Sequence, residues 1–311
     1  MGTSRHGDGA ASVLGLVIHP TRPVAGSVTT IVDWARRHAV DVIARAVESD
    51  RVAGVDAVPD EEFVNRVDGV VSLGGDGTML AALRLVIARP VPVLGVNHGN
   101  LGFLIEITPV ELEGALARLV SGEFTIEDHA CLAASSTGTV ELVPSVGFND
   151  IVLGRLGRSG TTSIDLSVGG QQYGYYNCDS LIVSTPTGST AYNYAAGGPV
   201  VSPSASAIVI TPVAPMAGIT RSVILGPGDE VTLHVATDSA EAGVEVDGTR
   251  SAVLDPEGAL SVRLREGAGK VVRLAAEAHG KRARIKLSLL DLPLRRDQLL
   301  DLIPEGLRRR A

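Results

Sequence analysis

The chain has 311 residues, of which 45% are hydrophobic and 20% are charged, and its formal net charge is −8. This length allows two domains with cores of their own, and the negative charge argues against a general nucleic-acid-binding protein. No apolar run approaches the roughly 20 residues that a membrane-spanning helix needs, so we expect no membrane segment.

Strand-like and helix-like segments alternate over the first 125 residues. Short apolar runs are separated by segments whose apolar residues recur at helical spacing. The predicted strands are residues 13–19, 40–47, 69–73 and 91–96, and the predicted helices are residues 27–40, 61–67, 79–87 and 111–121. The alternation predicts an open, parallel, Rossmann-like α/β sheet, in which ligands bind at the carboxyl ends of the strands.

A glycine-rich turn follows the predicted strand at 69–73. It contains Gly74, Gly75 and Gly77, and Thr78 is the predicted N-cap of the next helix. Glycines let backbone N–H groups approach a phosphate, and a helix N-terminus adds partial positive charge. Asp76 is unusual there, because its carboxylate repels a phosphate unless it holds a metal or accepts a proton from an attacking hydroxyl. For this stretch alone, a tight turn with a capping aspartate is the alternative.

The pattern changes after residue 123. Short alternating runs are separated by Gly, Pro, Ser and Asp, which predicts a β-rich second domain. Apolar residues from Ile285 onward indicate a tail that returns to the first domain. We therefore predict an α/β domain over residues 1–124, a β-rich domain over 125–275 and a C-terminal segment over 276–311.

Two polar segments of the second domain suit a nucleotide. Asn149 and Asp150 stand side by side before a predicted strand, and an amide next to a carboxylate can bind the hydroxyls of a sugar. An Asx turn is the alternative reading of this pair. Residues 184–192 form a hydroxyl-rich loop between apolar flanks, which suits the edge of a planar ligand better than a surface loop.

The positions of lysine and cysteine restrict the chemistry further. The lysines are Lys270, Lys281 and Lys286, so the first domain has no Walker-A lysine, kinase-type strand lysine or Schiff-base lysine. Phosphoryl transfer would have to use backbone amides, arginines, a metal and a carboxylate. Cys131 and Cys178 lie far apart, so we expect no disulfide bond and a location in the reducing cytoplasm.

Four segments in this order closely resemble the NAD kinases, and a late Asp247-Gly248 adds to the match. The segments are GGDGT at 74–78, NHGNLGF at 97–103, ND at 149–150 and STPTGSTAY at 184–192. The resemblance covers nearly the whole chain. It implies an α/β domain and a β-rich domain with the site between them. It also implies transfer of a phosphoryl group from ATP, or from polyphosphate, to the 2′-hydroxyl of the adenosine ribose of NAD, which gives NADP.

The resemblance also implies roles for individual residues. Asp76 would be the general base, and Gly74, Gly75, Gly77 and Thr78 would cradle phosphate. Asn149 and Asp150 would hold ribose and adenine, and Asp179 would reach toward the nicotinamide half. The other residues implied in nucleotide binding are Asn97, Phe103, Thr187, Thr190, Ala191, Tyr192 and Ala195. Mg²⁺ would arrive with ATP and need no cluster of protein ligands. A homodimer or homotetramer is expected.

Two departures from the family pattern matter for binding. Ala195 stands where the family often has Ser, which puts one polar contact in doubt, and Asn177 stands where Arg or Gly is common. Two other functions stay open at this point. A lipid or small-alcohol kinase shares GGDGT but would give the TAY of 190–192 no role. A non-catalytic dinucleotide-binding paralogue would not need Asp76.

Overall fold

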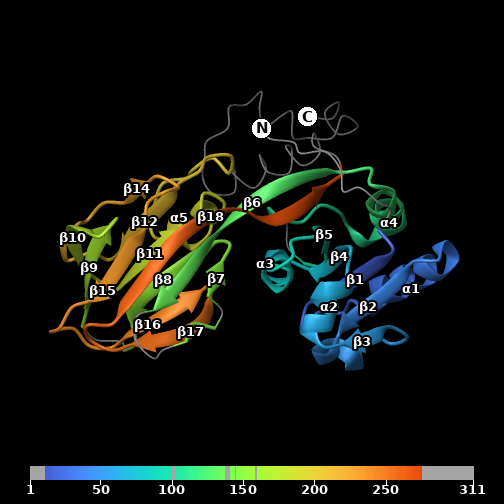
Figure 1. The fold of residues 1–311 in the computed structure, drawn as a ribbon, viewed down its shortest axis with the longest axis horizontal. Coiled ribbons are helices and arrows are strands. Elements are labelled where there is room, and N and C mark those ends of the chain that lie inside the picture. Colours follow the sequence, from blue (N-terminus) through green and yellow to red (C-terminus); the bar gives the residue numbers. More distant parts are fainter. Residues whose placement is uncertain (1–10, 100–101, 137–140, 144, 158–159, 275–311) are drawn as a thin grey trace, which may run out of the picture. The chain divides into compact units, whose positions relative to one another are not determined.

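The computed structural model describes residues 11–99, 102–136, 141–143, 145–157 and 160–274 (Figure 1). They form two units, an α/β unit of residues 11–127 with 270–274 and a β-rich unit of residues 128–269. The chain passes from one unit to the other within β6 (Thr125–Ser136) and β18 (Ala259–Arg273). The domain limits predicted above stay a proposal, and the tail predicted at 276–311 lies outside the described residues.

A parallel sheet forms the centre of the α/β unit. Its strand order is β5-β4-β1-β2-β3, and the last residues of β18 pair in parallel with β5. The strands are β1 (Val13–Ile18), β2 (Asp41–Arg45), β3 (Asp56–Val58), β4 (Gly69–Gly74) and β5 (Pro92–Asn97). The helices are α1 (Ala25–His38), η1 (Ala46–Arg51), α2 (Asp60–Arg66), α3 (Asp76–Leu85), η2 (Pro109–Glu111) and α4 (Leu112–Ser121). The predicted open α/β sheet is confirmed.

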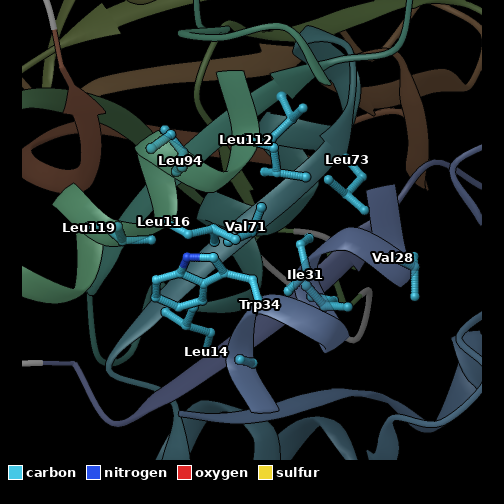
Figure 2. Close-up of a cluster of buried hydrophobic side chains, with 14 of the residues drawn as sticks. Leu14, Val28, Ile31, Trp34, Val71, Leu73, Leu94, Leu112, Leu116 and Leu119 are labelled. Carbon is cyan, nitrogen blue, oxygen red and sulfur yellow. The ribbon is translucent and has the colours of Figure 1, made fainter. Parts of the chain in front are cut away.

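Helices cover both faces of this sheet. On one face, Trp34 of α1 and Leu116 of α4 are buried in one cluster with alternate strand residues, among them Leu14 and Val71 (Figure 2). On the opposite face, Gly15 lies so close to the ring of Phe63 of α2 that no side chain would fit between them. The alternation follows from the strand period of two, which sends successive side chains to opposite faces.

The start of α3 differs from the prediction. The helix runs from Asp76 to Leu85 with Gly75 as its N-cap, so the prediction of Thr78 as the N-cap is wrong. The N–H groups of Thr78 and Met79 both donate to the carbonyl of Gly75, at 3.0 and 3.1 Å. The reason is that Gly75 adopts an extended conformation and lets the helix begin at once. Asp76 therefore lies in the first turn of the helix, where a carboxylate is favoured by the helix dipole.

The β-rich unit has two antiparallel sheets with one core. The first has the order β13-β10-β9-β15-β18 and the second the order β14-β12-β11-β8-β16-β17. The strands are β7 (Val146–Gly147), β8 (Asp150–Arg155), β9 (Thr162–Val168), β10 (Gln171–Cys178), β11 (Ser180–Ser184), β12 (Ile208–Val213), β13 (Ala217–Gly218), β14 (Val223–Leu225), β15 (Val231–Val235), β16 (Ala242–Val246) and β17 (Thr249–Leu254). Leu166 and Leu233 of the first sheet are buried in one cluster with Leu153 and Leu181 of the second. The predicted β-rich character is confirmed.

The hydroxyl-rich segment is more regular than a loop. It contains a 3-10 turn, η3 (Gly188–Thr190), followed by a short helix, α5 (Tyr192–Ala195). In the part of the chain that the structure describes, no helix combines the length and apolar character needed to cross a membrane.

Candidate functional site

The carboxylate of Asp76 is oriented by the loop that follows β5. The N–H of Phe103 donates to Oδ2 at 2.8 Å, and the N–H of Leu104 donates to Oδ1 at 3.1 Å. The two N–H groups contact different oxygens of the carboxylate, so together they fix its orientation. The structure thus brings together two residues that the sequence predicted separately, Asp76 and Phe103.

A pocket of about 730 Å³ opens beside Asp76 in the α/β unit. Its volume lies in the range of small-molecule sites. The pocket lies at the carboxyl ends of β4, β1 and β2, where parallel α/β sheets bind ligands. Its lining includes Gly75, Asp76, Gly77, Thr78, Gly102, Arg22, Arg45, Arg51, His19 and Glu48.

The pocket receives positive charge from arginines. Arg22 donates to the carbonyl of His98 at 2.9 Å, and Arg51 donates to the carbonyls of His19 and Arg22. Within the described residues, neither Arg22 nor Arg51 forms an ion pair, whereas Arg45 makes two hydrogen bonds to the carboxylate of Asp60, at 2.8 and 2.6 Å. Arg22 and Arg51 therefore supply net positive charge beside the glycine turn.

Two other titratable groups line this pocket. Burial raises the pKa of Glu48, which accepts a hydrogen bond from the N–H of Ile18 at 3.1 Å. Burial, and then the positive charges of Arg22 and Arg51, lower the pKa of His19. Sequence reasoning missed Arg22 and Arg51, although the absence of lysine from the first domain had pointed to arginine as the cation.

In the β-rich unit, Asp247 holds the turn that presents Asn149 and Asp150. Its carboxylate accepts hydrogen bonds from the N–H groups of Phe148, Asn149 and Asp150, at 3.0, 2.7 and 3.2 Å. Asp247 itself has a positive φ of 46° and is followed by Gly248. The late Asp-Gly pair of the sequence therefore fixes the direction of the Asn149-Asp150 pair.

The hydroxyl-rich segment packs directly on the same turn. Thr185 Oγ1 donates to the carbonyl of Phe148 at 2.7 Å and accepts from the N–H of Gly188 at 2.9 Å. A side chain at Gly188 would collide with the backbone of Asn149. The structure thus brings the predicted segments at 149–150 and 184–192 together.

The buried side chain of Asn193 holds the residues that follow. It donates to the carbonyls of Ser189 and Pro199, at 3.0 and 2.9 Å, and accepts from Thr211 at 2.7 Å. The side chains of Tyr192 and Ala195 are exposed, and those of Thr187, Thr190 and Ala191 are half-buried. This leaves a rigid, partly exposed surface that a ligand can contact.

Asp150 is buried among acidic groups. Burial, followed by the negative charges of Asp247 and Glu245, raises the pKa of Asp150 to about 7. Its carboxyl group therefore changes charge near neutral pH, where a change in binding strength would be measurable.

Asp179 lies in a second pocket of the β-rich unit, with a volume of about 380 Å³. Arg155 forms an ion pair with it, with Nε 3.0 Å from Oδ1 and Nη2 3.0 Å from Oδ2. Tyr192, Glu245 and Arg250 also line this pocket. Sequence reasoning missed Arg155, since no local pattern links it to a residue 24 positions later.

Each unit thus holds one group of the predicted site residues. The α/β unit holds Gly74, Gly75, Asp76, Gly77, Thr78, Asn97 and Phe103, and the β-rich unit holds Asn149, Asp150, Asp179, Thr187, Thr190, Ala191, Tyr192 and Ala195. Asn97 shapes its loop, because its Oδ1 accepts the N–H of Gly99 at 2.9 Å. Within the described residues, no three His, Cys, Asp or Glu side chains gather as a metal site would require.

Comparisons with known proteins agree with this division. Residues 24–124 match the family model described as the ATP-NAD kinase N-terminal domain, and residues 148–274 match that of the ATP-NAD kinase C-terminal domain. NAD kinase 1 of Streptomyces avermitilis is 33% identical over 315 residues, which cover 90% of this chain and 88% of that protein.

Two solved structures are similar in fold. The yeast NADH kinase complexed with NADH has a TM-score of 0.81 and 23% identity, covering 93% of this chain and 91% of that one. At this identity the likeness concerns the fold alone. An NAD kinase from Archaeoglobus fulgidus in complex with ATP has a TM-score of 0.68 and 25% identity, covering 90% of this chain and 98% of that one.

Proposed function

The chain belongs to the NAD kinase family and phosphorylates NAD with ATP, and we propose that Asp76 is the general base of this reaction. The observation that carries the proposal is the pair of N–H groups, from Phe103 and Leu104, that orients the carboxylate beside the glycine turn. In the step, Asp76 takes the proton of the 2′-hydroxyl of the adenosine ribose as the hydroxyl oxygen attacks the γ-phosphorus of ATP. The bond from that phosphorus to the β,γ-bridging oxygen breaks, and ADP leaves.

The donor phosphates are proposed to bind in the pocket of the α/β unit. Gly75, Gly77 and Thr78 lie at the N-terminus of α3, where N–H groups and the helix dipole favour an anion. Arg22 and Arg51 add fixed positive charge, and the glycines let the phosphates come close to the backbone. The N–H groups and the two arginines would thus provide the positive charge that a lysine provides in other phosphate sites.

Mg²⁺ is proposed to enter on the triphosphate, where it would neutralise charge. In such sites Mg²⁺ commonly uses substrate phosphates and only one or two protein carboxylates. The pocket fits this, because its lining carries the carboxyl groups of Asp76 and Glu48. Polyphosphate stays open as an alternative donor, and the homodimer or homotetramer and the cytoplasmic location stay predictions.

The acceptor is proposed to bind on the β-rich unit. The turn at Asn149 and Asp150 would hold ribose hydroxyls and adenine, because Asp247 fixes its backbone and an amide next to a carboxyl group can pair with hydroxyls. Thr187, Thr190, Ala191, Tyr192 and Ala195 would line the adenine. Asp179, with Arg155, would face the nicotinamide half.

The test measures NADP formation with ATP and, separately, with polyphosphate as the donor. Asp76→Asn should lower kcat by about 10²–10⁴-fold, because loss of a general base costs that much, while the isosteric amide preserves the turn and NAD binding. Asp33→Asn, an exposed position on α1 of the same unit, is the control and should keep wild-type kcat. Turnover by Asp76→Asn within a few-fold of wild type would remove Asp76 from the role of base.

A further inference from the structure

We propose that Arg273 is a positioning residue for Asp76 and acts through the backbone of Phe103 and Leu104; the inference rests on the proposed role of Asp76. Arg273 donates from Nη1 to the carbonyl of Leu104 at 3.1 Å and from Nη2 to the carbonyl of Phe103 at 3.2 Å. These are the two residues whose N–H groups donate to the carboxylate of Asp76.

One peptide group links the two charges directly. The carbonyl of Phe103, which accepts from Arg273, and the N–H of Leu104, which donates to Asp76, belong to the same peptide bond. Because that bond is planar and its C=O and N–H point in opposite directions, fixing the carbonyl also fixes the direction of the N–H. Hydrogen bonds in such a chain also polarise one another, so the guanidinium strengthens the N–H donor.

Arg273 is itself held rigidly. Its Nε donates to Glu127 at 2.7 Å, and its Nη1 lies 3.4 Å from Glu106 Oε2. Glu106 in turn accepts the N–H of Leu274 at 2.9 Å. The side chains of Arg273 and Glu106 are only 4% and 1% exposed. Earlier in the same strand, Lys270 and Val271 pair with Pro92 and Val93 of β5, so the backbone that carries Arg273 belongs to the central sheet.

This degree of burial points to a role beyond stability. The cost of removing two charges from water often offsets their attraction, so the buried pair of Arg273 and Glu106 need not stabilise the fold. The fork of Arg273 instead has a geometric use, since it contacts two successive carbonyls and two carboxylates at once. A lysine would keep the charge but could not span these positions.

The test compares Arg273→Lys with Arg118→Lys. Arg118 also contacts the end of β18, because it donates to the carbonyl of Leu274 at 2.8 Å, but its other bond goes to the carbonyl of Glu123. We expect Arg273→Lys to lower kcat by about 10–100-fold, as for other residues that orient a reacting group through a second one. The KM values for NAD and ATP should stay within about twofold of wild type, and Arg118→Lys should keep wild-type kcat.

A double variant covers the case in which Arg273→Lys does not fold, because it removes a buried acid together with the arginine. Arg273→Met with Glu106→Gln removes the cation together with its most buried acid, and it should show the same loss of kcat with unchanged KM values. Wild-type kcat in Arg273→Lys, or an equal loss in Arg118→Lys, overturns the inference. Asp76→Asn separates the two proposals: if it is inactive while Arg273→Lys is fully active, only the role of Arg273 fails, whereas activity in Asp76→Asn removes the proposed base itself.

Discussion

Gly102 has no space for a side chain, because the carboxylate of Asp76 occupies the position where a Cβ atom would lie. Replacement of Gly102 by Ala should therefore push the carboxylate away from the N–H groups of Phe103 and Leu104. Misplacement of a reacting group by about 1 Å can cost on the order of 10²-fold in rate, so we expect a loss of kcat of that size. Steady-state kinetics of Gly102→Ala with saturating ATP and NAD measure it.

A second glycine provides the control for this experiment. Gly114 lies in α4 of the same unit, and a Cβ atom there would meet nothing within 4 Å. Gly114→Ala should keep wild-type kcat and gain slightly in stability, because alanine favours helix over glycine. A Gly102→Ala enzyme with wild-type kcat would show that the carboxylate has room to move without consequence.

Asp150 should make the stability of the protein depend on pH. Its pKa is raised from 3.8 to about 7 in the folded protein, by burial first and then by Asp247 and Glu245. Protonated Asp150 contributes to the free energy of unfolding. This contribution is fully present below pH 4 and is lost as the pH rises through about 7. Asp150→Asn stays neutral, so relative to wild type it should become more stable as the pH rises, by on the order of 4 kcal/mol at most.

Urea denaturation of wild type and Asp150→Asn at pH 5, 6, 7 and 8 checks this prediction. The difference in the free energy of unfolding should grow along the series and level off above the folded pKa of about 7. A difference that is the same at every pH would mean that Asp150 is not held protonated by its surroundings. The KM for NAD should rise at low pH in the wild type, since the ionised carboxylate is the stronger acceptor for ribose hydroxyls.

Thr185 connects the hydroxyl-rich segment to the turn at 148–150. Thr185→Val removes a hydroxyl that bonds both the carbonyl of Phe148 and the N–H of Gly188, leaving both backbone groups buried without this partner. We expect a loss of about 1–3 kcal/mol in the free energy of unfolding and a higher KM for NAD. Thr232→Val on β15 is the control, because among the described residues its hydroxyl makes one contact, a long one of 3.4 Å to Ser261. Equal stability of the two variants would contradict the role assigned to Thr185.

The ion pair of Arg155 and Asp179 bears on the choice between NAD and NADH. Oxidised nicotinamide carries a positive charge that the reduced ring lacks, and Asn177 adds no charge of its own. Because Arg155 offsets the charge of Asp179, we expect NAD to be preferred by about tenfold or less, with NADH measurably phosphorylated.

Arg155→Met tests this explanation. It leaves the negative charge of Asp179 without the arginine and should shift the ratio of kcat/KM for NAD to that for NADH by about fivefold toward NAD. Arg250→Met, which changes another arginine of the same pocket, serves as the comparison, since Arg250 pairs with Glu245 at 3.5 Å and not with Asp179. The explanation fails if NADH is used better than NAD, or more than about 10³-fold less efficiently.

The sequence alone determined the fold class and the family, because both depend on local patterns. The alternation of apolar strands and helices over the first 125 residues predicted the parallel sheet, and the segments at 74–78, 149–150 and 184–192 identified the kinase. The helix boundary was the exception. Thr78 has the composition of an N-cap, yet Gly75 takes that position, and the N–H groups of Thr78 and Met79 both donate to its carbonyl.

Only the tertiary structure decided which residues support these motifs. Arg273 reaches Leu104 across 169 positions of the chain, and Arg22 reaches His98 across 76. Their partners are backbone carbonyls, which every residue carries, so no side-chain pattern in the sequence marks either contact. The order of the strands brings about both contacts. Arg273 meets Leu104 because β18 pairs with β5, and the loop that follows β5 orients Asp76. Arg22 meets His98 because β1 pairs with β4, which places the segment after β1 beside the glycine turn.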